Sequence, residues 1–230
     1  MCGRATLAKQ PKALAKRYQA KFKENNSSSP LPNYNIAPTH WHPVVTNASP
    51  NELQYFRWGL IPHWAKDPKI ASKLINARKE TVLEKPSFKV VNQQRCLVPF
   101  DGFYEWKKVG KQRVPYRIIL PETEIFSLAG IWSIWKSADG ETIPTFTVLT
   151  QEPNDLMATI HNRMPVILTK DHERTWLDHN LSVADFLQEV SLYSSEKMKA
   201  YRVSDRVNQV SNNDARLLEA VADYQQGSLF

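Results

Sequence analysis

The sequence predicts an α+β fold with a curved, mostly antiparallel sheet or barrel-like core and peripheral helices. Short segments rich in β-branched and aromatic residues follow one another, separated by turn residues. Short strands joined by tight turns pair antiparallel, because parallel pairs need long crossover connections. The 230 residues show no linker or break in composition, so we expect a single domain across residues 1–230.

The predicted strands share apolar runs bounded by Gly, Pro, Asn, Asp or charged residues. They span residues 42–46, 53–58, 95–98, 102–107, 114–120, 126–135 and 144–150. Gly110 and the pair Asp139-Gly140 lie between such runs. These residues tolerate a positive φ, so both positions predict tight hairpins.

The predicted helices lie at the periphery, and the first is the clearest. Leu14, Tyr18 and Phe22 recur at helical spacing after Pro11, which favours a helix over residues 11–24. A loop is expected over residues 25–32, where serines and prolines gather. Shorter helical segments, several with polar N-cap residues, are predicted over residues 81–84, 87–92, 154–160, 171–177, 182–190 and 214–222.

Composition and charge narrow the function classes. No apolar run approaches the roughly 18–20 residues of a membrane span, and the charged first twenty residues lack a secretory signal. Two cysteines suit a reducing compartment, so we expect a cytoplasmic protein, associated with the nucleoid if it is bacterial. We also expect a monomer without a membrane partner. The net charge of +7 favours polyanions. A cluster of basic residues near the start of the chain could follow a phosphate backbone, but we expect it to form the solvated face of an amphipathic helix; its members are Lys9, Lys12, Lys16, Arg17, Lys21 and Lys23.

Cys2 follows Met1 directly, so loss of Met1 would give a 1,2-aminothiol. With reference pKa values of about 7.7–8.0 for the amine and about 8.5 for the thiol, part of each group is nucleophilic near neutrality. An aldehyde can form an imine with the nitrogen and then close onto the sulfur as a thiazolidine. An incidental thiol is the competing interpretation.

Glu105 lies between Tyr104 and Trp106 on a predicted buried strand. Burial raises the pKa of a carboxyl group, which makes Glu105 a candidate proton shuttle. A structural ion pair with an arginine is the alternative.

Three further polar residues are candidates for the same site. His161 follows a predicted helix, and its loop can aim an imidazole suited to acid and base chemistry. Asn76 can orient the Cys2 amine through its amide, and Arg78 offers a bidentate fork for a phosphate.

Trp58 and Trp64 lie beside basic residues and a proline, a composition able to stack against unpaired bases. Core packing is the competing role. His40, His42 and His63 have no cysteine or carboxylate at ligand spacing, so we expect no metal site, and no glycine-rich motif predicts a cofactor.

Six motifs in order resemble the SOS-response-associated peptidase family. They are Met1-Cys2-Gly3-Arg4, Tyr34-Asn35-Ile36-Ala37-Pro38, the segment 58–64, Asn76-Ala77-Arg78, residues 101–106 (Asp-Gly-Phe-Tyr-Glu-Trp) and residues 161–165 (His-Asn-Arg-Met-Pro). The tail at Tyr201-Arg202-Val203 and Val207-Asn208 resembles the family more weakly. Members often carry Asp at the position of Asn162.

The resemblance implies a protein that removes its own Met1 and traps abasic sites in single-stranded DNA as a thiazolidine crosslink. It implies the fold of that family, Cys2 as nucleophile, and Asn76, Glu105 and His161 around it. We expect the DNA to contact Arg4, Arg78, Trp58, Trp64 and Trp106. Two other functions stay open: an N-terminal-nucleophile amidohydrolase, in which the Cys2 amine is the base, and a non-catalytic nucleic-acid-binding module.

Overall fold

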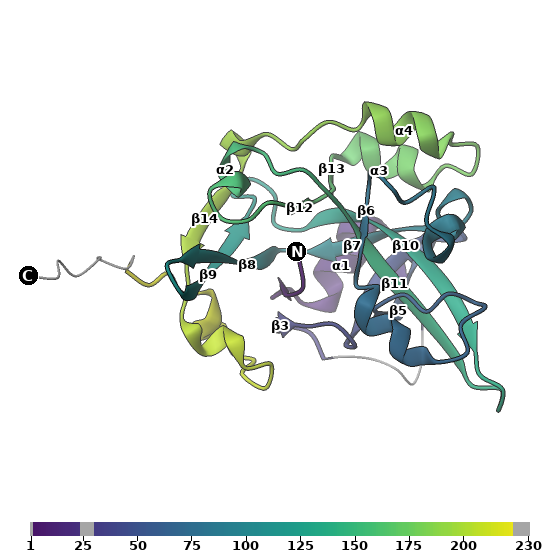
Figure 1. Ribbon diagram of the computed structural model, residues 1–230, viewed down its shortest axis with the longest axis horizontal. Helices are drawn as coiled ribbons and strands as arrows, with labels where there is room; N and C mark the ends of the chain where they lie inside the picture. Colours follow the sequence, from purple (N-terminus) through teal and green to yellow (C-terminus); the bar gives the residue numbers. More distant parts are fainter. Residues whose placement is uncertain (1, 24–29, 223–230) are drawn as a thin grey trace, which may run out of the picture.

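A closed barrel of five strands forms the centre of the computed structural model, which describes residues 2–23 and 30–222 (Figure 1). The strands are β4 (Trp41–Thr46), β5 (Ser49–Trp58), β7 (Arg95–Phe100), β10 (Phe126–Lys136) and β11 (Thr142–Gln151). Neighbours pair antiparallel in the order β11-β10-β7-β4-β5. A short parallel pairing of β5 with β11 closes the ring. The predicted α+β class and barrel-like core are confirmed.

A second sheet continues from the barrel and is antiparallel throughout. Its order is β14 (Lys199–Arg202), β9 (Gln112–Ile119), β8 (Gly102–Val109), β1 (Ala5–Leu7) and β3 (Asn33–Ile36). Only Asp101 separates β7 from β8, so the chain passes directly from barrel to second sheet. Both predicted hairpins are present, with φ of 60° at Gly110 and 86° at Gly140.

Several short strands pair with strands of the barrel. β6 (Asn76–Arg78) pairs parallel with β11, and β2 (Lys21–Phe22) pairs parallel with β5. β12 (Met164–Pro165) pairs with β11, and β13 (Ile167–Leu168) pairs with β10.

Aromatic side chains fill the barrel between β4, β5, β7 and β11. Trp58 stacks on Phe146 with ring centroids 6.0 Å apart, and His42 stacks on Phe100 at 4.6 Å. The buried His42 bonds the Pro99 carbonyl at 2.7 Å, and burial lowers its pKa to about 3. His42 is therefore a neutral core residue at physiological pH.

The helices confirm some predictions and correct others. The predicted helix 11–24 is too long: α1 (Pro11–Tyr18) ends at Gln19, whose left-handed φ of 50° turns the chain toward β2. Residue 24 and most of the predicted loop 25–32 lie outside the described residues. The predicted helix 81–84 is wrong, because these residues form turns.

The remaining predicted helices are present with altered length or type. α2 (Asp155–Ala158), α3 (Lys170–Leu177) and α4 (Val183–Glu189) start after side-chain N-caps, as expected. The segments predicted at 87–92 and 214–222 are the 3₁₀ helices η2 (Pro86–Asn92) and η5 (Ala215–Leu218). Three further 3₁₀ helices are η1 (Pro68–Lys73), η3 (Ser195–Lys197) and η4 (Asp205–Asn208). Within 2–23 and 30–222, every helix is too short or too polar to cross a membrane.

Gly59, directly after β5, packs tightly against the 3₁₀ helix η1. Its φ of 114° disfavours any side chain, and an added Cβ would lie 2.8 Å from the Ala71 carbonyl oxygen. We predict that Gly59→Ala lowers the free energy of unfolding by about 3 kcal/mol or more. The control Gly140→Ala, with φ of 86° but open space around it, should cost about 1–2 kcal/mol. Urea unfolding measures both, and equal losses would contradict the close contact.

Candidate active site

The pairing of β1 with β8 places Cys2 beside the strand that carries Glu105. Ala5 lies opposite Phe103, and the Tyr104 amide donates to the Arg4 carbonyl at 2.9 Å. The chain before Ala5 therefore runs back along β8 toward Glu105. Cys2 is 1% exposed and Glu105 is 2% exposed, so the predicted burial of Glu105 is confirmed.

Asn76 reaches the same place from β6, which the barrel strand β11 holds. Its Nδ2 donates to the Cys2 carbonyl at 2.8 Å. The amide thus holds the Cys2 backbone at its carbonyl, while the expected contact with the Cys2 amine stays a prediction. Within the described part of the chain, the buried Oδ1 of Asn76 has no hydrogen-bond partner. An acceptor is therefore available next to Cys2.

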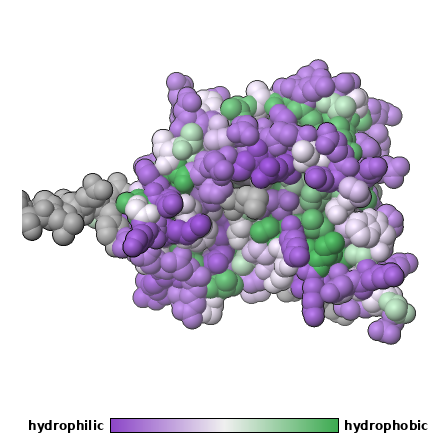
Figure 2. All heavy atoms as spheres, in the orientation of Figure 1, coloured by the Kyte–Doolittle hydropathy of each residue, from purple (hydrophilic) through white to green (hydrophobic). Residues whose placement is uncertain are grey.

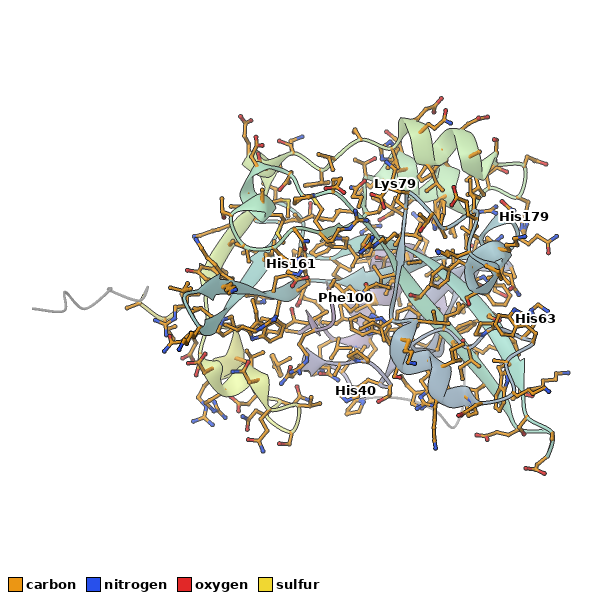
Figure 3. The ribbon with its side chains drawn as sticks, viewed as in Figure 1. His40, His63, Lys79, Phe100, His161 and His179 are labelled. Carbon is orange, nitrogen blue, oxygen red and sulfur yellow. The ribbon has the colours of Figure 1, made fainter. Side chains whose placement is uncertain are left out.

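His161 lies in the loop between α2 and β12 (Figure 3). The Arg163 backbone N–H donates to His161 Nδ1 at 3.0 Å. The Arg163 carbonyl oxygen lies 3.3 Å from the same nitrogen. The shorter contact, in which the backbone N–H can only donate, favours a neutral ring with its proton on Nε2. Burial lowers the pKa of His161. The backbone hydrogen bond with Arg163 opposes this shift, and the charges of Arg113 on β9 and of Arg163 add to it.

Burial also sets the protonation of Cys2 and Glu105. It raises the pKa of the Cys2 thiol, the Glu105 charge raises it further, and the Arg4 backbone N–H opposes the shift. The thiol of the chain that begins with Met1 is therefore held in its protonated form. The expectation of a partly ionised thiol concerns the chain after loss of Met1 and stays a prediction. Burial raises the pKa of Glu105 to about 6, against an ordinary value near 4.3, although the Trp106 backbone N–H favours the carboxylate. Glu105 can take up and release a proton near neutrality.

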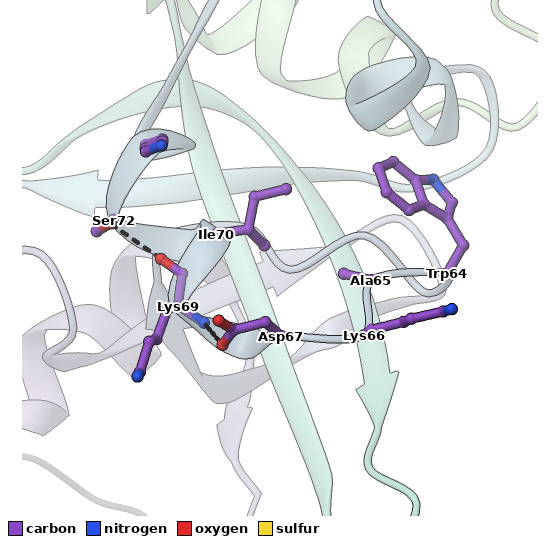
Figure 4. A pocket seen from close by; sticks show the side chains of 8 residues that line it. Trp64, Ala65, Lys66, Asp67, Lys69, Ile70 and Ser72 are labelled. Carbon is purple, nitrogen blue, oxygen red and sulfur yellow. Dashed lines mark hydrogen bonds between the residues drawn. The ribbon is translucent and has the colours of Figure 1, made fainter.

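The tryptophans predicted to contact DNA differ in their exposure to solvent. Trp58 is 0% exposed and donates to the Ile75 carbonyl at 2.9 Å, so its predicted base-stacking role is corrected to core packing. Trp64 is 52% exposed and lines a surface pocket of about 410 Å³ with Lys66 and Lys69 (Figure 4). Trp106 is partly buried and donates to Asn208 at 2.8 Å.

The two arginines predicted to contact phosphates also differ. Arg78 is exposed at the end of β6. Arg4 is partly buried, and its Nη1 donates to Asn35 at 2.8 Å and to the Val207 carbonyl at 2.6 Å.

Hydrophilic side chains cover most of the face of the molecule that Figure 2 shows. The positive charge of Arg113 near His161 was missed, although the basic residues of the β8–β9 hairpin are visible in the sequence.

The three histidines considered for a metal do not converge. His40 and His63 lie well apart in Figure 3, and His42 is inside the barrel. Across the described ranges, no group of three His, Cys, Asp or Glu side chains is arranged to share an ion.

The stability of a Glu105→Gln variant tests the electrostatics of this site. A carboxyl group with a raised pKa binds its proton more tightly in the folded state, so its ionisation lowers stability as the pH rises from about 4.3 to above 6. We predict that Glu105→Gln is more stable than the parent by roughly 1–2 kcal/mol at pH 7.5, and equal to it near pH 4. Urea unfolding at both pH values is the measurement. A structural ion pair predicts the opposite, a loss of stability at pH 7.5.

Known proteins similar to this chain include several from Bacillus subtilis (strain 168). The abasic site processing protein YoaM is 46% identical over 193 residues, covering 82% of this chain and 85% of that protein. The abasic site processing protein YoqW is 41% identical over 225 residues, covering 96% of this chain and all of that protein. The abasic site processing protein HMCES of Xenopus tropicalis is 30% identical over 265 residues, covering 96% of this chain and 78% of that protein.

A solved structure and a family pattern agree with these relatives. A crystal structure of a protein from Bacteroides thetaiotaomicron superposes with a TM-score of 0.86 at 31% identity, covering 96% of this chain and 100% of that one. Residues 1–210 match the pattern of the SOS response associated peptidase (SRAP) family. With the fold, the ordered motifs and these relatives in agreement, the chain belongs to the SRAP family.

Proposed function

We propose that this protein processes abasic sites in single-stranded DNA by forming a covalent thiazolidine through Cys2. The observation that carries the proposal is the contact of Asn76 with the Cys2 backbone beside a buried carboxyl group, Glu105, whose pKa is raised to about 6. The names of the Bacillus relatives, abasic site processing proteins, support the choice of substrate.

The first step is removal of Met1. Water cleaves the peptide bond between the Met1 carbonyl carbon and the Cys2 nitrogen, so hydroxyl goes to Met1 and hydrogen goes to the nitrogen. Glu105 is the group suited to move that proton, because its pKa lies close to the working pH. The product carries an α-amine and a thiol on neighbouring carbons of Cys2.

The second step traps the aldehyde that an abasic sugar exposes when its ring opens. The Cys2 amine attacks C1′, water leaves, and an imine forms. The thiol sulfur then bonds to the same carbon while the imine nitrogen gains a proton, so ring closure loses no atoms. Because burial keeps the thiol protonated, its proton must be accepted during closure, and Glu105 is the adjacent base.

Asn76 and His161 complete the proposed site. The buried Oδ1 of Asn76 is available to accept a hydrogen bond from the Cys2 amine, which would orient it toward the aldehyde. The neutral His161, with a proton on Nε2, can donate to the deoxyribose oxygen as the ring opens, and the same group assists reversal.

The proposed selectivity for abasic sites in single-stranded DNA follows from the need to expose the sugar aldehyde to Cys2. A normal base would occupy the space that the aldehyde needs, and paired DNA would hold the sugar away from Cys2. We propose that Arg78, Trp64 and Trp106 contact the flanking strand, with the net charge of +7 adding general attraction.

Cysteine variants test the proposed covalent chemistry. With an abasic single-stranded oligonucleotide, the parent and the control Cys96→Ser should give a heat-stable shifted band on a denaturing gel, because Cys96 is buried in the barrel core. Cys2→Ser should lose this band and retain at most an imine that borohydride traps. No band from the parent would favour the amidohydrolase. Salt-sensitive binding that survives Cys2→Ala, with no adduct from the parent, would favour a non-catalytic binding module.

The pH dependence of crosslinking tests Glu105 as the base. The rate should rise as the pH increases through about 6 and then level, because the ionised carboxylate is the active form. Glu105→Gln should lose this rise and react about 100-fold more slowly at pH 7.5. The measurement is single-turnover crosslinking between pH 5 and 8. Because the variant is expected to retain Met1, an aminopeptidase first removes Met1 from both proteins, and intact mass checks that loss. An unchanged profile in the variant would exclude Glu105 as the base.

A further inference from the structure

We propose that Glu80 is a positioning residue for His161 and acts through the side chain of Arg163. This inference deepens the proposed function, on which its catalytic consequence rests. Glu80 follows β6, and Arg163 precedes β12 in the loop that carries His161.

A bidentate ion pair joins Glu80 to Arg163. Arg163 Nη1 donates to Glu80 Oε1 at 2.8 Å, and Nη2 donates to Oε2 at 2.7 Å. The arginine side chain is 8% exposed, whereas the glutamate side chain is 43% exposed. Burial acts to raise the pKa of Glu80, but the hydrogen bonds and charge of Arg163 prevail and lower it, so Glu80 remains ionised near neutrality. Two parallel bonds fix the plane of the guanidinium group as well as its position.

The fixed arginine in turn holds the imidazole. The Arg163 backbone N–H donates to His161 Nδ1 at 3.0 Å, and the Arg163 carbonyl oxygen lies 3.3 Å from the same nitrogen, so the position of this one residue decides which ring nitrogen keeps a proton. Loosening the arginine side chain would release that N–H and allow the other tautomer. The proposed donor, Nε2–H, would then be only partly populated.

The same ion pair ties the loop of His161 to the strand of Asn76. The Thr150 carbonyl on β11 accepts from Arg163 Nη2 at 2.8 Å and from the Lys79 backbone N–H at 2.7 Å. Lys79 lies between β6 and Glu80, so the two segments that carry Asn76 and His161 meet at a single carbonyl. Glu80 is therefore placed to keep both side chains in register.

Glu152 provides a matched control. It accepts one hydrogen bond from the same guanidinium group, from Arg163 Nη1 to Glu152 Oε1 at 3.0 Å, and its side chain is 75% exposed. Replacing Glu152 by Gln removes one negative charge beside Arg163 and leaves the bidentate pair intact. Among the described residues, the charges of Arg113 on β9 and of Arg163 itself also act on His161, and neither glutamate variant changes those two charges.

The test reads the His161 tautomer by long-range ¹H–¹⁵N NMR in the full-length protein, assigned with His161→Gln. The parent and Glu152→Gln should show Nε2 protonated and Nδ1 free of a proton at neutral pH. Glu80→Gln should show a mixture of tautomers and crosslink abasic single-stranded DNA about 10-fold more slowly than Glu152→Gln. Arg163→Lys, which keeps the charge and loses the fork, should match Glu80→Gln.

Each result decides the inference. A single tautomer and an unchanged rate in folded Glu80→Gln would overturn it, and so would equal effects of the two glutamate variants. If the parent fails to crosslink abasic DNA, the proposed function fails. The tautomer comparison then still decides whether Glu80 positions His161.

Discussion

The antiparallel pairing of β1 with β8 is the interaction on which the candidate site depends. It brings the start of the chain against the strand that carries Glu105. A buried polar cluster fastens the same pair of strands: Thr6 Oγ1 donates to Asp101 Oδ1 at 2.5 Å, and Arg117 Nη2 donates to that oxygen at 3.2 Å. An unpaired buried charge would cost several kcal/mol, so this cluster resists separation of the strands. Cys2 is thereby held in place by both sheets, since β6 on the barrel supplies Asn76.

Burial gives the site its chemical character. It shifts the pKa values of three groups so that each group's neutral form is favoured. The pKa values of the Cys2 thiol and the Glu105 carboxyl group are raised, and that of the His161 imidazole is lowered. A thiol that stays protonated is inert until a base accepts its proton, and Glu105 can do this at a pH near 7. In the proposed mechanism, protons pass between these neighbouring groups as bonds form, so little charge has to be desolvated. The raised pKa of Glu105 is the property that its proposed role in proton transfer requires.

The sequence predicted the barrel-like core, the hairpins at Gly110 and Gly140, and burial of Glu105, because turn residues and apolar runs are local signals. Strands of two to four residues such as β1 and β6 were missed, since so short a segment carries no periodicity. The parallel closure of β5 with β11 joins residues far apart in the chain, and no local pattern indicates it. Trp58 was ambiguous for a different reason: its composition suits a base or a core equally, and only the closed barrel decides. The motifs drew attention to Cys2, Asn76, Glu105 and His161 as separate segments of the sequence. How these residues are arranged in space depends on the fold.

Mass spectrometry of the intact protein, followed by peptide mapping, tests the central claim most directly. The purified protein should have lost one methionine residue and should begin at Cys2 with a free amine. After exposure to an abasic single-stranded oligonucleotide it should gain one DNA adduct per chain, mapped to Cys2. Fully active protein that retains Met1, carries a blocked amine or bears its adduct on another residue would contradict the account.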